Sequence, residues 1–217
     1  MNYHMKCDPK KTRKIVEDVK PAVLIAATKY TDADQLSVLE ENGVTIFGEN
    51  RVQDFLKKRK EYKGHAHWHF IGTLQSNKVK YIIDKVDLIH SISSYSLIDE
   101  VEKQASKHDL KIHVLIQVNI AQEESKHGFK KEEMDDVISY IMNKQHIVLE
   151  GLMMMAPDIE PSQTRIYFKE TRELLESINQ KYHLHLSKLS MGMSQDYKIA
   201  LEEGSTMVRI GHALFKG

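Results

Sequence analysis

The sequence of 217 residues has a single cysteine, Cys7, only four prolines and no long hydrophobic run. One cysteine excludes an internal disulfide framework and is typical of a protein from a reducing compartment. No apolar run approaches the roughly 18 residues that a membrane-spanning helix needs, and the first residues lack the apolar core of a signal peptide. These absences predict a cytoplasmic protein.

An excess of charge of one sign is also lacking, since 31 lysine and arginine residues balance 31 aspartate and glutamate residues. A neutral chain has no overall field that would attract nucleic acid or an anionic membrane, so we expect neither as a partner. The G-x-S-x-G nucleophile elbow, the Walker-type phosphate loop and the G-x-G-x-x-G dinucleotide fingerprint are missing as well. The enzyme classes that depend on these motifs are therefore not indicated.

What the sequence does contain is a regular alternation of strand and helix patterns. A helical segment within residues 1–20 is predicted to cover the bottom of the fold. Eight strands follow, at 22–27, 44–47, 67–71, 86–90, 111–119, 147–153, 186–189 and 206–210. Regular alternation with short connections implies parallel strands and right-handed crossovers. Eight such units predict an α/β fold, a single (β/α)8 (TIM) barrel domain over residues 1–217, with an open doubly wound sheet as the alternative.

The first predicted strand, residues 22–27, leads to one lysine, Lys29, just beyond its carboxyl end. Six small or branched apolar residues without alternation are typical of a strand that is buried on both faces. Ligands of α/β barrels bind where the strands end, so an amine at this position faces a prospective site. A solvated lysine that closes a strand is the alternative interpretation.

The loops after the last two strands have the composition of a phosphate site. Gly192 and Ser194 follow the seventh strand, and Arg209 and Gly211 lie at the end of the eighth. Glycine lets the backbone approach a ligand closely, and Ser194 is predicted to be the N-cap of a helix whose free amides bind an anion. Barrels bind phosphate after strands seven and eight, which supports this interpretation, and ordinary turn glycines with an ordinary cap are the alternative.

Polar residues also end or follow other predicted strands: Asn50, His90, Ser91 and Asn119. The alternation of His65, His67 and His69 puts three imidazoles on one face of an extended segment, which is a spacing that a metal can use. No cysteine or acidic residue adjoins them, so we predict no metal site and a structural or pocket-lining role for His69. The run of three methionines at 153–155 is interpreted as core filling at a strand end.

These residues together offer a lysine amine, an anion pocket and an arginine, without an evident pair of nucleophile and base. Such a set suits an aldehyde that carries a phosphate. Pyridoxal 5′-phosphate (PLP), held as a Schiff base, is a cofactor of this kind.

Seven motifs then carry a resemblance to a known family. They are AATK at 26–29, FGEN at 47–50, WHFIGTLQSNK at 68–78, VNIAQEESKHG at 118–128, GLM at 151–153, LSMGMS at 189–194 and VRIG at 208–211. With them the sequence resembles the pyridoxal phosphate homeostasis proteins (the YggS or PROSC family) nearly end to end. This family is related to the N-terminal barrel of alanine racemase. The resemblance implies a fold-type III PLP-binding barrel without the C-terminal β-domain of the racemases.

The resemblance also implies roles for individual residues. Lys29 would carry PLP as a covalent aldimine, and Arg209 would face the pyridine nitrogen, to which a guanidinium can only donate a hydrogen bond. The other implied cofactor-binding residues are Asn50 beside the ring, His69, His90 and Ser91 in the pocket wall, and Met193, Ser194, Gly211 and His212 around the phosphate. Lys126 of the ESKHG motif is either a secondary cofactor contact or a solvated lysine. His212 stands where the family usually has threonine, which leaves its backbone amide for the phosphate.

The racemases that the sequence resembles have a further domain, which contributes a catalytic tyrosine from the partner subunit. The sequence ends just after the eighth strand, which leaves Lys29 as the one obvious base for a bound substrate. We therefore expect a monomeric carrier and buffer of PLP rather than an enzyme, with apoenzymes that need PLP as its partners. A slow racemase or transaminase is the first alternative. A barrel that binds another phosphorylated metabolite without a Schiff base is the second.

Overall fold

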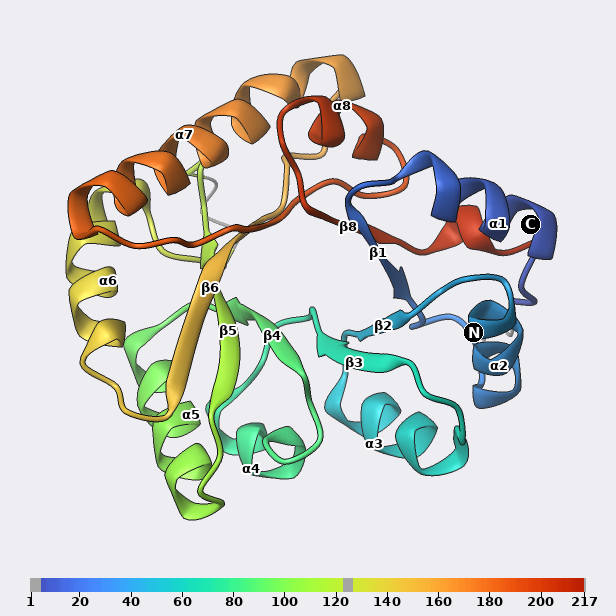
Figure 1. Cartoon of the computed structure of the whole chain (residues 1–217), viewed down its shortest axis with the longest axis horizontal. Helices are drawn as coiled ribbons and strands as arrows, with labels where there is room; N and C mark the ends of the chain where they lie inside the picture. The colour runs from blue at the N-terminus through green and yellow to red at the C-terminus, as the bar shows by residue number, and fades with distance from the viewer. Residues whose placement is uncertain (1–4, 123–126, 217) are drawn as a thin grey trace.

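The computed structural model describes residues 5–122 and 127–216 as a closed ring of strands inside a ring of helices (Figure 1). The strands are β1 (Val23–Ala27), β2 (Ile46–Glu49), β3 (His67–Phe70), β4 (Leu88–Ile92), β5 (Ile112–Val118), β6 (Ile147–Met154), β7 (Lys188–Ser190) and β8 (Met207–Ile210). Each strand pairs in parallel with the next, and β8 pairs with β1 to close the barrel. The predicted (β/α)8 barrel is confirmed, and the open sheet is excluded.

The helices surround the strands. They are α1 (Pro9–Asp18), α2 (Ala33–Glu41), α3 (Val52–Glu61), α4 (Val79–Ile82), α5 (Tyr95–Lys107), α6 (Met134–Met142), α7 (Arg165–Tyr182) and α8 (Tyr197–Glu202). Single 3₁₀ turns are η1 (Ser76–Lys78), η2 (Lys131–Glu133), η3 (Pro161–Gln163) and η4 (His212–Leu214).

The position of α1 corrects the expectation that the N-terminal helix covers the bottom of the fold. In Figure 1 it lies in the outer ring between α8 and α2, and it contacts α2 and η4. Thr12 and Ile15 of the helix, together with Val19 after it, are buried. Their spacing of three and four residues puts them on one helix face, which packs against the side of the barrel.

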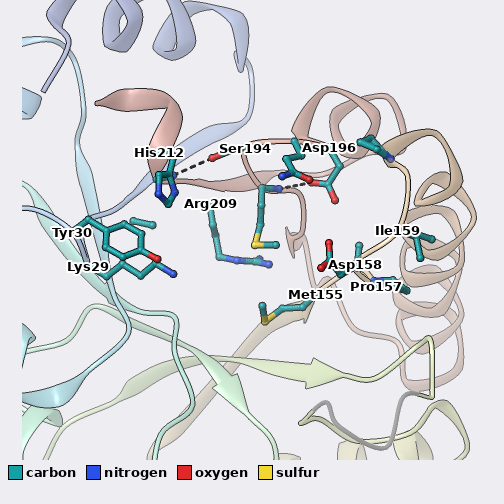
Figure 2. Close-up of a pocket in the computed structure, with 16 residues that line it drawn as sticks. Lys29, Tyr30, Met155, Pro157, Asp158, Ile159, Ser194, Asp196, Arg209 and His212 are labelled. Atoms are coloured by element: carbon teal, nitrogen blue, oxygen red, sulfur yellow. Dashed lines mark hydrogen bonds between the residues drawn. The ribbon is translucent and has the colours of Figure 1, made fainter. Parts of the chain in front are cut away.

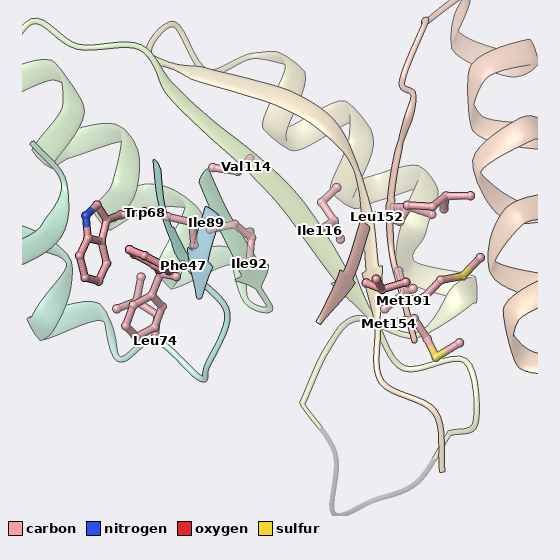
Figure 3. Packing of buried hydrophobic residues seen from close by; sticks show 14 of the residues in the cluster. Phe47, Trp68, Leu74, Ile89, Ile92, Val114, Ile116, Leu152, Met154 and Met191 are labelled. Atoms are coloured by element: carbon pink, nitrogen blue, oxygen red, sulfur yellow. The ribbon is translucent and has the colours of Figure 1, made fainter. Parts of the chain in front are cut away.

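Burial on both faces explains the unbroken apolar run of β1. Leu24 and Ala26 belong to a large cluster between strands and helices, part of which Figure 3 shows. Ile25, which points the other way, belongs to a small cluster inside the barrel. Both kinds of position must be apolar, so the strand cannot alternate with polar residues.

Three strands begin about two residues later than the sequence pattern predicts. The predicted strand at 44–47 is observed as β2, the one at 86–90 as β4 and the one at 186–189 as β7. For the first two the cause is visible, since the amides of Val44 and Val86 still donate to the carbonyls of Leu39 and Ile82 in the preceding helical turns. The shift places Glu49 and Ser91 inside strands rather than in the loops beyond them.

Candidate functional site

A cavity of about 400 Å³ opens at the carboxyl ends of β1, β6, β7 and β8 (Figure 2). Four chain segments line it, one after each of these strands. Its walls are Ala27, Lys29, Tyr30, Met155–Ile159, Pro161, Met193–Asp196, Arg209, Gly211 and His212. The cavity therefore lies at the end of the barrel where ligands of this fold bind.

Lys29 enters this cavity from the end of β1. Its ammonium lies 4.6 Å from the centre of the Tyr30 ring, which itself lies 4.8 Å from the imidazole of His212. Figure 2 shows Lys29 and Arg209 reaching into the same space. The residue predicted to be the anchor is thus an exposed amine at the mouth of a cavity, opposite a buried guanidinium.

The backbone that precedes Lys29 is fixed by a buried ion pair. The ammonium of Lys58, on α3, donates to the carbonyl of Thr28 and to Oε1 of Glu49 at the end of β2. The Thr28 hydroxyl donates to the same carboxylate oxygen. Burial raises the pKa of Glu49, and the Lys58 ammonium and the Thr28 hydroxyl act in the opposite direction. Three side chains therefore join the ends of β1 and β2 directly behind the lysine.

Arg209 is 5% exposed and forms hydrogen bonds with neutral acceptors. Its guanidinium donates to the Ser190 hydroxyl at 2.6 Å and to the Met154 carbonyl at 2.9 Å. Within the described ranges it forms no ion pair with a carboxylate. Burial lowers the pKa of Arg209 to about 10, against the attraction of Asp196, so the side chain stays charged near neutral pH. The cavity wall thus contains a buried cation that is available to an electron-rich ligand.

The loops after β7 and β8 meet at the upper wall of the cavity. The Gly211 amide donates to the Ser194 hydroxyl at 3.4 Å, and the Arg209 amide donates to the carbonyl of Gly192. Asp196, rather than Ser194, occupies the N-cap position of α8, so that prediction is wrong. The Asp196 carboxylate instead accepts from the Met193 amide at 2.7 Å, which folds residues 193–196 into a turn before the helix starts.

Six of the ten predicted cofactor-binding residues line the cavity. They are Lys29, Met193, Ser194, Arg209, Gly211 and His212. The other four, Asn50, His69, His90 and Ser91, are outside this lining and stay predictions. The Asn50 side-chain oxygen and the Ser91 hydroxyl are buried and have no hydrogen-bond partner among the described residues. Lys126 lies outside the described residues.

Sequence reasoning missed the wall that follows β6. Asp158 and Ile159 line the cavity, as does Met155, which is 40% exposed. Core filling therefore describes Met153 and Met154, each 1% exposed, but not Met155. Position just beyond the carboxyl end of a barrel strand was the available signal for this loop.

Neither a metal cluster nor a membrane span is present in the described parts of the chain. No three histidine, cysteine, aspartate or glutamate side chains gather there in an arrangement that could hold a metal ion. No helix within these ranges is long and apolar enough to cross a membrane. His67, in the middle of the predicted histidine triplet, is exposed, whereas His69 is buried.

Comparison with known proteins adds a family to this geometry. The family model described as alanine racemase, N-terminal domain, matches residues 10–217. A pyridoxal phosphate homeostasis protein of Aquifex aeolicus is 42% identical over 196 residues, which are 89% of this chain and 86% of the relative. The protein of the same name from Escherichia coli is 32% identical and covers 88% of this chain and 84% of its own.

Solved structures show the same architecture. PipY of Synechococcus elongatus PCC7942 with PLP bound has a TM-score of 0.89 and 29% identity, and the match covers 96% of this chain and 99% of PipY. Alanine racemase of Corynebacterium glutamicum has a TM-score of 0.79 at 17% identity, over 99% of this chain and 63% of the racemase. The second likeness concerns the fold alone.

Proposed function

Since this chain belongs to the pyridoxal phosphate homeostasis proteins and contains the alanine racemase N-terminal domain, we propose that it binds PLP as a Schiff base on Lys29. We further propose that it acts as a carrier and buffer of the cofactor rather than as an enzyme. Such a protein limits the concentration of the free aldehyde and passes PLP to apoenzymes. We propose that it works as a monomer in the cytoplasm.

The observation that carries the proposal is the common cavity of Lys29 and Arg209. The two side chains come from the ends of neighbouring strands, β1 and β8, and line the same space as Ser194 and Gly211. An amine, a buried cation without a carboxylate partner among the described residues, and two loops with glycine suit an aldehyde with a ring nitrogen and a phosphate. The buried Asn50 oxygen and Ser91 hydroxyl, both unpaired within the described ranges, lie outside this cavity lining, and their contact with the ligand stays a prediction from the family resemblance.

Each of these residues would contact a different part of PLP. Lys29 supplies the amine, while Ser194, Gly211 and His212 would hold the phosphate, partly through backbone amides. Arg209 would face the ring nitrogen, and because a guanidinium only donates, this contact favours an unprotonated ring. Bound PLP supplies an electron sink for carbanion chemistry, and an unprotonated ring is a weaker one. This argument supports a carrier over a catalyst.

An absorption spectrum tests the binding proposal. Purified protein mixed with PLP is expected to develop a visible imine band, which borohydride converts into a stable adduct on Lys29. Lys29→Ala should lack both the band and the adduct. Lys188→Ala removes a lysine at the start of β7, at the end of the strand away from the cavity, and should keep both the band and the adduct. A band of equal strength in Lys29→Ala would overturn the proposal, and a colourless wild type would favour another phosphorylated ligand.

Two further measurements separate a carrier from an enzyme. The loaded protein, mixed with an excess of a PLP-dependent apoenzyme, is expected to lose its band as the apoenzyme gains activity. Cofactor that stays on this protein would count against transfer. Incubation of the loaded protein with amino acids in D₂O should leave their Cα hydrogens unexchanged. Exchange that Lys29→Ala abolishes would instead establish a slow racemase or transaminase.

A further inference from the structure

Behind Arg209, four polar side chains form a continuous hydrogen-bonded chain through the barrel interior. His69 Nδ1 lies 2.9 Å from His90 Nε2, and His90 Nδ1 lies 2.8 Å from the Ser190 hydroxyl. Arg209 donates to that hydroxyl at 2.6 Å. The four residues come from β3, β4, β7 and β8, and each is at most 5% exposed. This hydrogen-bonded chain therefore crosses the inside of the barrel from His69 to Arg209 in the cavity wall.

The apolar surroundings of this chain make its polar groups costly unless they are paired. Ser190 pairs in register with Met153 and Met207, which belong to the apolar cluster inside the barrel. A buried hydroxyl or imidazole nitrogen without a partner costs about 1–3 kcal/mol, so the favoured proton arrangement is the one that pairs the Ser190 hydroxyl and both ring nitrogens of His90.

The direction follows from Arg209, which can only donate. The Ser190 oxygen accepts from the guanidinium, so the Ser190 hydroxyl hydrogen needs an acceptor of its own. Among the described residues that acceptor is Nδ1 of His90. A neutral His90 then carries its proton on Nε2 and donates to Nδ1 of His69. The opposite direction would leave the Ser190 hydroxyl hydrogen buried and unpaired.

Both imidazoles are neutral. Burial lowers the pKa of His69 to about 3, and burial together with the charges of nearby groups, Arg209 and Lys188 among them, lowers the pKa of His90 well below its usual value. Among these four hydrogen-bonded side chains, the positive charge is therefore confined to Arg209, which lines the cavity. A hydroxyl that donates onward to an imidazole is also a stronger acceptor, which tightens its bond to the guanidinium.

We propose that Ser190, His90 and His69 are positioning residues that fix the guanidinium of Arg209 for its ligand. The guanidinium donates through Nη1 to Ser190 and through Nη2 to the Met154 carbonyl, and its other donors have no hydrogen-bond partner among the described residues. The ligand chemistry that fits is a ring nitrogen with a free lone pair. This inference rests on the proposed binding of PLP, but the proton arrangement on which it depends exists without ligand.

The first test measures that arrangement in protein without PLP. Nitrogen-15 NMR of the histidine side chains is expected to show His69 and His90 as neutral Nε2–H tautomers between pH 6 and pH 8. In Ser190→Ala the His90 signals should change, because Nδ1 loses its donor. An Nδ1–H tautomer of His90, or a charged His90 in this range, would overturn the inference whether or not PLP binds.

The second test uses matched substitutions and PLP as the probe. His90→Leu removes the acceptor of the Ser190 hydroxyl while filling the space, whereas His90→Asn keeps an acceptor at the Nδ1 position. Ser190→Ala and His90→Leu are expected to raise the dissociation constant for PLP by about tenfold, the effect of one hydrogen bond to a charged group. They should also shift the pH at which the visible band changes. His90→Asn should restore most of both properties.

A control separates these effects from general loss of packing. Ser205, between α8 and β8, has a buried hydroxyl that donates to the Met191 carbonyl at 2.7 Å, and among the described residues no hydrogen bond joins it to Arg209. Ser205→Ala should therefore keep the wild-type dissociation constant. Equal affinities of Ser190→Ala and wild type, with both proteins folded by circular dichroism, would overturn the positioning role and leave the binding of PLP intact. A loss in His90→Asn as large as in His90→Leu would also contradict it.

Discussion

The ammonium of Lys58 lies 2.6 Å from Oε1 of Glu49, and the two side chains are only 8% and 0% exposed. Lys58 belongs to α3 and Glu49 to β2, so the pair joins the outer ring to the barrel wall. The same ammonium donates to the Thr28 carbonyl, which belongs to the residue before Lys29. The position of the proposed cofactor lysine thus depends on an ion pair that never touches the cavity.

Loss of one partner of this pair should be costly. Lys58→Met leaves the Glu49 carboxylate buried without a counter-charge, so the free energy of unfolding is expected to fall by about 3–5 kcal/mol in urea denaturation. Lys57→Met, an exposed change on the same helix, should alter it by less than about 0.5 kcal/mol. The double variant Lys58→Met/Glu49→Gln should recover part of the loss. Similar losses in the Lys57 and Lys58 variants would contradict the importance of the pair.

Acid should destabilise the protein through its buried histidines. The pKa of His69 is about 3 in the folded protein but about 6.5 in an unfolded chain, so the unfolded state binds more protons between these values. The stability that neutral His69 contributes is present above pH 6.5 and is lost as the pH falls toward 3, at up to about 1.4 kcal/mol per pH unit. Urea denaturation at pH 7, 6, 5 and 4 measures this slope.

Two histidine variants isolate that contribution from other titrating groups. His69→Gln removes one buried imidazole and should reduce the dependence of stability on pH below 6.5, while the contribution of buried His90 remains. His65→Gln changes an exposed histidine four residues away and should keep the wild-type slope. An unchanged slope in His69→Gln would mean that His69 is charged in the folded protein or accessible to solvent.

Two glycines, one in the loop after β7 and one in the loop after β8, are expected to respond differently to alanine. Gly192 has a φ of +95°, and an added Cβ would lie 2.6 Å from the Cβ of Ala200. Gly192→Ala should therefore lower the free energy of unfolding by about 1–3 kcal/mol. Gly211 has a negative φ of −113°, and an added Cβ there would meet its nearest neighbour, the Ala27 carbonyl oxygen, at 3.4 Å. Gly211→Ala should stay within about 1 kcal/mol of wild type. Thermal unfolding of the two variants decides the matter, and equal losses would refute the distinction.

Ser91→Ala is expected to change the affinity for PLP without lowering the stability of the fold. The Ser91 hydroxyl has no hydrogen-bond partner within the described residues, so Ser91→Ala should leave the free energy of unfolding unchanged or raise it by up to about 1 kcal/mol. If the hydroxyl serves PLP, the same variant should bind PLP several-fold more weakly in a fluorescence titration. Ser205→Ala, which removes a satisfied hydroxyl, should show the reverse pattern, with about 1 kcal/mol of destabilisation and normal binding. A clear loss of stability in Ser91→Ala would contradict the prediction.

The barrel was predictable because its signals are local. Each strand is a short apolar run, each connection contains a helical pattern, and the β1 run has no alternation because Leu24 and Ile25 face opposite apolar layers. The positions of the strand ends follow from the same pattern, which is why the sequence alone points to Lys29 and Arg209. The starts of β2 and β4 were misplaced because the preceding helical turns keep the amides of Val44 and Val86.

The interior contacts were not predictable, because no sequence period encodes them. His90 and Ser190 are 100 residues apart and meet only because the barrel is closed. Family resemblance placed His69 and His90 in the pocket wall, yet their observed hydrogen bonds join them to each other and to Ser190. The loop after β6, which contains Asp158, was missed for a related reason. Nothing in its composition distinguishes a cavity wall from an ordinary connection between a strand and a helix.

The pairing of β8 with β1, in which Arg209 lies beside Ile25, joins the two strands that are farthest apart in the sequence. Closing this seam costs the most chain entropy of any strand pair, and it is a step that local structure cannot accelerate. Until it closes, Lys29 and Arg209 belong to opposite ends of an open chain and no binding site exists. A ligand held by both residues would therefore stabilise the pairing of β1 with β8. Transient separation of these two strands is the motion that ligand binding suppresses first.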